Sequence, residues 1–104
     1  MGFLGRLVGK RETIAGFEEF VEKLKEIEPA LLAESDFRKI KKILEPLLII
    51  MDKIEASHPE LHETVDKIAF FVLEELPRDK GNTDDKKRHI ADLQALTSRP
   101  VSWF

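Results

Sequence analysis

The sequence predicts an all-α protein, a small antiparallel bundle of four main helices. Apolar residues recur every three or four positions along most of the chain, which is the spacing of one helix face. No segment alternates apolar and polar residues, Tyr is absent, and Val and Thr are few, so the residue types of a sheet are missing. With 104 residues the chain is long enough for one core but too short for two.

The first helix is expected from Thr13 onward. Pro29 removes a backbone donor and clashes with the preceding turn, so the helix should end or kink near Ile27 and leave a short extra turn over 29–34. Ser35 then serves as the N-cap of the next helix. The predicted core face of the first helix consists of Ile14, Phe17, Phe20, Val21, Leu24, Ile27 and Leu31.

The second helix is expected over about 36–56, with a bend at Pro46. Apolar residues occupy almost its whole circumference, which is typical of a central helix. Its predicted core face consists of Phe37, Ile40, Ile43, Leu44, Leu47, Leu48, Met51 and Ile54.

The third helix is expected to begin with a capping box of Ser57 and Glu60 and to end at Pro77. After a loop over 78–82, Thr83 should cap the fourth helix, which ends before Pro100. The core stripe of the third helix is Leu61, Val65, Ile68, Val72 and Leu76, and that of the fourth is Ile90, Leu93 and Leu96. Segments 12–36 and 57–77 are net acidic, whereas 37–56 and 78–104 are net basic, so successive helices favour neighbouring positions.

The chain divides into a basic head over 1–11, the bundle over 12–97 and an aromatic tail over 98–104. The head has the composition of a short amphipathic segment that lies on anionic lipid, although three Gly weaken its helicity; the alternative is a frayed or docked N-terminus. The tail should fold back on the bundle or dock on a partner. The candidate membrane residues are Phe3, Leu4, Arg6, Leu7, Val8, Lys10 and Arg11, and the candidate partner-binding residues of the tail are Val101, Trp103 and Phe104.

Four apolar residues lie off the core stripes of the second and third helices. On a helical wheel Ile49 lies opposite its stripe with Ile50 on the flank, and Phe70 lies opposite the stripe of the third helix with Leu73 toward the same side. One interpretation is that other helices and the tails cover them. The other is that they form a protein contact surface, in which Phe70 is the aromatic anchor.

Other function classes have little support in the sequence. The net charge is -3, and the basic clusters over 38–42 and 86–89 have no interleaved aromatics, so nucleic acid is not expected as a partner. His58, His62 and Asp66 recur every four residues, but their order differs from known zinc motifs, and neither a metal nor a cofactor is predicted. No Cys and no catalytic motif are present, so neither enzymatic activity nor a small-molecule substrate is expected.

These observations favour a non-enzymatic helical interaction or assembly module. It would act as a homo-oligomer, an adaptor or a small subunit of a larger complex. The alternative is a peripheral membrane protein that docks through its basic head. The absence of Cys fits the cytoplasm, including the inner face of a membrane, and the longest apolar run, Pro46 to Met51, is too short to span a bilayer.

Overall fold

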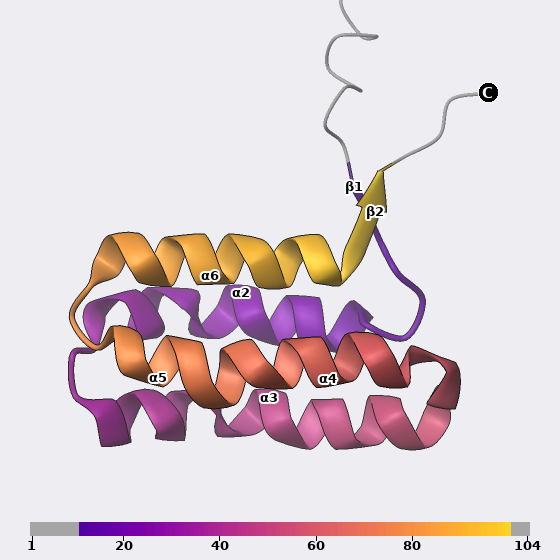
Figure 1. Cartoon of the computed structure of the whole chain (residues 1–104), viewed down its shortest axis with the longest axis horizontal. Coiled ribbons are helices and arrows are strands. Elements are labelled where there is room, and N and C mark those ends of the chain that lie inside the picture. Colours follow the sequence, from indigo (N-terminus) through magenta and orange to yellow (C-terminus); the bar gives the residue numbers. More distant parts are fainter. Residues whose placement is uncertain (1–10, 101–104) are drawn as a thin grey trace, which may run out of the picture.

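The computed structural model, which describes residues 11–100, is an all-α bundle (Figure 1). Its helices are α2 (Glu18–Ala33), α3 (Phe37–Ser57), α4 (His62–Phe70), α5 (Leu76–Asp79) and α6 (Thr83–Leu96). A 3₁₀ turn, η1 (Pro59–Leu61), precedes α4, and a π-helical turn, η2 (Phe71–Glu75), joins α4 to α5. We refer to α4, η2 and α5 together as the third helix. The predicted fold class is confirmed.

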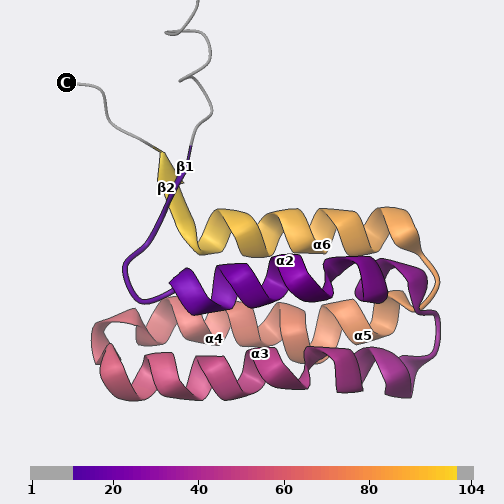
Figure 2. The same ribbon diagram turned by 180° about the vertical axis from the view of Figure 1, so that it is seen from behind.

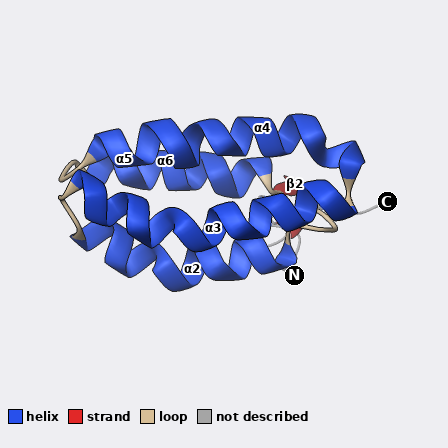
Figure 3. Cartoon of the chain, turned by 90° about the horizontal axis from the view of Figure 1, so that it is seen from below, coloured by secondary structure: helices blue, strands red, loops and turns tan. Residues whose placement is uncertain are grey.

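The four helices pack around one central core. Successive helices run in opposite directions, α2 packs on α3 and α6, and the third helix packs on the same two neighbours (Figures 2 and 3). Most predicted stripe residues are buried, among them Phe20, Leu47 and Ile68. Phe37 is an exception, because it is 40% exposed and lies under the Lys41 ammonium, 5.2 Å from its ring centroid.

The prolines interrupt the helices less than the sequence suggests. α2 continues through Pro29 to Ala33, so an end of the helix near Ile27 and a separate turn over 29–34 are wrong. Leu24 and Leu31 are both buried and lie two turns apart, and burying both on one face requires a continuous helix. α3 likewise contains Pro46 without a break.

The third helix also extends beyond its predicted end at Pro77, as far as Asp79. The wide π turn lies directly before Pro77, and the amide of Leu76 donates to the carbonyl of Phe71, five residues back. In a regular α-helix the proline ring would clash with the carbonyl of Leu73. The local widening therefore lets the chain pass Pro77 while Leu76 and Pro77 remain buried.

Two helix caps lie one residue from their predicted positions. Asp36, not Ser35, caps α3, and its Oδ1 accepts the amide of Lys39 at 3.1 Å. Asn82, not Thr83, caps α6, and its Oδ1 accepts the amide of Asp85 at 3.1 Å. Both residue types are favoured N-caps, so neighbouring candidates compete and the local backbone decides between them.

The start of α2 and the corner after α3 also differ from the prediction. α2 begins at Glu18, and the chain before it turns at Gly16, which has a positive φ of 102° and where a Cβ would lie 3.0 Å from the His58 ring. The predicted capping box is absent, because Ser57 is still the last residue of α3. The Glu60 carboxylate instead lies 3.2 Å from Nδ1 of His58.

A short two-stranded ladder projects from one end of the bundle, where the sequence predicted no strand. β1 (Arg11–Thr13) pairs antiparallel with β2 (Ser98–Pro100), with Arg11 opposite Pro100 (Figure 1). The amide of Ile14 extends the contact by donating to the carbonyl of Thr97 at 2.9 Å. Strands of three residues are too short to show alternation in sequence. The ladder brings the ends of the described chain together.

Candidate interaction surface

Three of the four off-stripe residues are exposed. Ile49 is 61% exposed, Phe70 52% and Leu73 47%. Ile50 is only 4% exposed and packs in the core, so its assignment to a contact surface is wrong. Ile50 lies on the flank of the α3 stripe, and this flank is also buried because the third helix and α2 cover α3 from two sides.

Phe70 lies at the middle of the solvent-facing side of the third helix. This outer face consists of exposed side chains spaced at three and four residues: Glu63, Lys67, Phe70, Glu74 and Arg78, with Leu73 at its edge. In Figure 3 the third helix runs along one edge of the bundle, with no further described element outside it. Among residues 11–100, no other element therefore covers the outer face along its length.

The Phe70 ring packs against Phe71 on the side that faces the core. Phe71 is half-buried and packs on the core, and its ring meets that of Phe70 edge to face with centroids 5.8 Å apart. A groove of about 440 Å³ lies beside Phe71, between η2 and α6, and is lined by Phe71, Asp92, Ala95 and Leu96. Phe70 thus packs on an aromatic ring that also lines a mostly apolar groove.

Ile49 belongs to a different side of the molecule. It lies one turn before Lys53, whose ammonium pairs with Glu19 of α2 at 3.6 Å. The side of α3 that faces the third helix is marked by Glu55, which lies 3.3 Å from Nδ1 of His62. Ile49 is therefore turned toward α2, and its role as a contact residue stays a prediction separate from that of Phe70.

Lys86 is buried, which the sequence did not predict. Its side chain is fully buried, and Nζ donates to the carbonyl of Leu31 at 2.9 Å and to that of Glu34, at the C-terminal end of α2. Burial lowers the pKa of Lys86, and the negative charges of Asp79 and Glu34 partly oppose this effect. The ammonium satisfies carbonyls that have no partner within α2.

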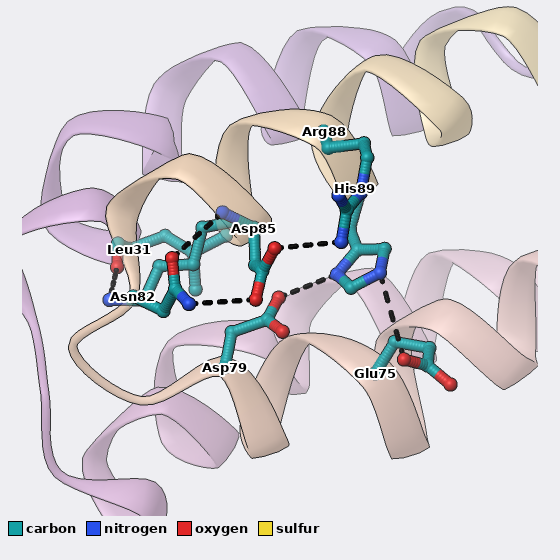
Figure 4. Close-up of polar contacts among 8 residues, drawn as sticks. Leu31, Glu75, Asp79, Asn82, Asp85, Arg88 and His89 are labelled. Atoms are coloured by element: carbon teal, nitrogen blue, oxygen red, sulfur yellow. Dashed lines mark hydrogen bonds and ion pairs between the residues drawn. The ribbon is translucent and has the colours of Figure 1, made fainter.

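His89 extends this polar cluster toward the third helix. Nδ1 lies 2.6 Å from Oδ2 of Asp79 and Nε2 lies 3.6 Å from Oε2 of Glu75 (Figure 4). The ring also packs on Phe71. Only Lys87 and Arg88 of the basic cluster over 86–89 face solvent, so the cluster is not a continuous surface patch. The sequence contained one indication that Lys86 is buried, because Lys86 lies two turns before Leu93 on the core stripe of the fourth helix.

The histidines near the start of the third helix take part in local ion pairs. His62 lies 3.3 Å from Glu55 and 3.2 Å from Asp66. Within residues 11–100 no group of three acidic or histidine side chains is arranged to hold a metal ion. In the same part of the chain, no helix combines the length and the apolarity needed to cross a bilayer.

Several predicted site residues lie outside the described residues: Phe3, Leu4, Arg6, Leu7, Val8 and Lys10 of the head, and Val101, Trp103 and Phe104 of the tail. Arg11 is the first residue of β1. Comparisons of the chain with protein-family models, with curated proteins and with solved structures found no match.

Proposed function

We propose that this chain is a non-enzymatic helical protein–protein interaction module of the cytoplasm, and that the outer face of the third helix is its contact surface. The single observation that carries the proposal is the exposure of Phe70 at the centre of that face, 52% open to solvent. Phe70 and Leu73 together form an apolar centre with charged residues around it. An apolar centre within a polar rim is the usual anatomy of a protein interface.

The rigidity of the site supports the same function. Phe71 supports the Phe70 ring from the core side, and ordering an anchor that is already held costs little conformational entropy on binding. Aromatic residues in such positions supply a large share of the binding energy in measured interfaces.

Site-specific photo-crosslinking tests this function. Benzoylphenylalanine at position 70 should crosslink to one discrete protein in the cells that produce the chain, and the same group at position 87, exposed on α6, should not. Adding Leu73→Asp to the position-70 probe should reduce the product, because the change puts a charge at the edge of the apolar centre. No discrete product at position 70, or the same product at both positions, would contradict the proposal.

A second candidate function, docking on an anionic membrane surface, is favoured by the β1–β2 ladder. The ladder pairs Arg11 with Pro100, so the sequences of the basic head and the aromatic tail are attached at neighbouring points. Stable membrane association usually needs two weak signals acting together. Covalent attachment at one end of the bundle would allow the two sequences to act on the same surface.

Vesicle partitioning distinguishes this alternative. Removal of residues 1–10 should reduce binding to vesicles containing anionic lipid by roughly tenfold or more, and removal of 101–104 should reduce it further, since both apolar burial and charge are lost. Arg11 and Pro100 are kept in both variants to preserve the ladder. Equal partitioning of the full and shortened chains would exclude the membrane function.

A further inference from the structure

We infer that the occupant of the outer face is a second copy of this chain, bound antiparallel across a two-fold axis beside Phe70. This inference rests on the proposed function and names its partner. It follows from the order of charges along the outer face and from the burial of the residues next to it.

The charges of the outer face are complementary to their own reverse order. From Glu63 to Arg78 the face carries negative, positive, aromatic, negative and positive residues in turn. In an antiparallel pair centred between positions 70 and 71, Glu63 meets Arg78 of the second copy, and Lys67 meets Glu74 of the second copy. Symmetry repeats both contacts, so four opposite-charge pairs form. A parallel pair in register would instead place every charge against itself.

The groups needed for these pairs are accessible. Neither Glu63 nor Lys67 forms an ion pair within the described part of the chain. Glu74 and Arg78 pair with each other at 3.3 Å, but their side chains remain 51% and 68% exposed. Both can therefore contact a second copy without being uncovered first.

The one unfavourable match of this register is removed by the fold. The same centre would place Asp66 opposite Glu75, which are both acidic. Glu75, however, is turned inward, with its carboxylate 3.6 Å from Nε2 of His89 and its side chain only 29% exposed. The like charges do not meet.

The apolar centre completes the fit. The register places Phe70 opposite position 71 of the second copy, so the two Phe70 rings flank the axis, each supported by its own Phe71. The face from position 63 to 78 is about 24 Å long at the helical rise. An interface of one helix face on each side is smaller than that of a permanent dimer, so the association is weak and depends on concentration.

Charge-reversal variants of the full chain test this register. Lys67→Glu and Glu74→Lys should each weaken self-association in sedimentation equilibrium by roughly tenfold, because two attractive contacts become repulsive. An equimolar mixture of the two variants should associate as strongly as the unaltered chain, since each new charge then faces an opposite one. Lys87→Glu, on an exposed site of α6, is the control and should change nothing. Thermal melts establish that every variant is folded.

Two results would overturn the inference. A mixture that associates no better than either variant alone contradicts the antiparallel register. An unaltered chain that stays monomeric at all concentrations contradicts the second copy as partner. In the latter case a discrete crosslink from position 70 to another protein would still support the proposed function, so the two claims fail separately.

Discussion

Replacement of Lys86 by alanine is expected to lower the free energy of unfolding by about 3 kcal/mol. Two carbonyls at the end of α2, those of Leu31 and Glu34, lose their donor and remain buried or partly buried. Loss of the fully buried side chain also leaves a void where the stem packed. The positive charge that the C-terminal end of α2 favours disappears as well.

Urea denaturation followed by circular dichroism measures this effect. Lys87→Ala, one residue further on an exposed site, is the matched control and should change the free energy of unfolding by less than about 0.5 kcal/mol. Lys86→Met retains most of the stem and should recover the packing share of the loss but not the hydrogen bonds. Equal effects of Lys86→Ala and Lys87→Ala would show that the buried ammonium has no structural role.

The lowered pKa of Lys86 predicts how its contribution changes with pH. Burial lowers the pKa from its ordinary value of 10.5, against the opposing charges of Asp79 and Glu34. Between the folded pKa and 10.5 the unfolded chain holds a proton that the folded chain has released, so the free energy of unfolding rises with pH. Below this window the full cost of burying the charge is present. The difference in unfolding free energy between the unaltered chain and Lys86→Met should therefore increase across the window, and a falling difference would contradict it.

Phe70→Asp is expected to weaken association through the outer face by roughly a hundredfold or more. The change removes the central aromatic anchor and places a carboxylate at the middle of the contact, where two copies would bring like charges together. The free energy of unfolding should change by less than about 1 kcal/mol, because half of the ring already faces solvent and only its contact with Phe71 is lost. A large loss of stability with unchanged association would assign Phe70 to packing instead.

The helical periodicity predicted the fold class and most of the core. Leu44, Leu47, Ile68 and Val72 are buried where their stripes place them, because burial of a continuous stripe depends only on the helical repeat. The same helical repeat places Phe70 and Leu73 off the core stripe, where both are exposed.

What the sequence did not predict depends on tertiary contacts. Pro29 and Pro77 indicated helix ends in the sequence. Burial of Leu31, just after Pro29, and of Leu76, just before Pro77, keeps both helices continuous. The sequence identified Lys86 only as part of a basic cluster, whereas its ammonium is buried against the carbonyls at the end of α2, 52 to 55 residues away in the chain. A partner so distant in sequence leaves no local pattern.

Sedimentation equilibrium of the full chain at micromolar concentrations is the most direct test of self-association through the outer face. Phe70→Asp and Ile49→Asp are measured alongside, because both residues are exposed and apolar but lie on different sides of the bundle. We predict that the unaltered chain and Ile49→Asp form a concentration-dependent dimer and that Phe70→Asp stays monomeric while folded. An unaltered chain that remains monomeric throughout, or equal loss of the dimer in both variants, would contradict self-association through the outer face.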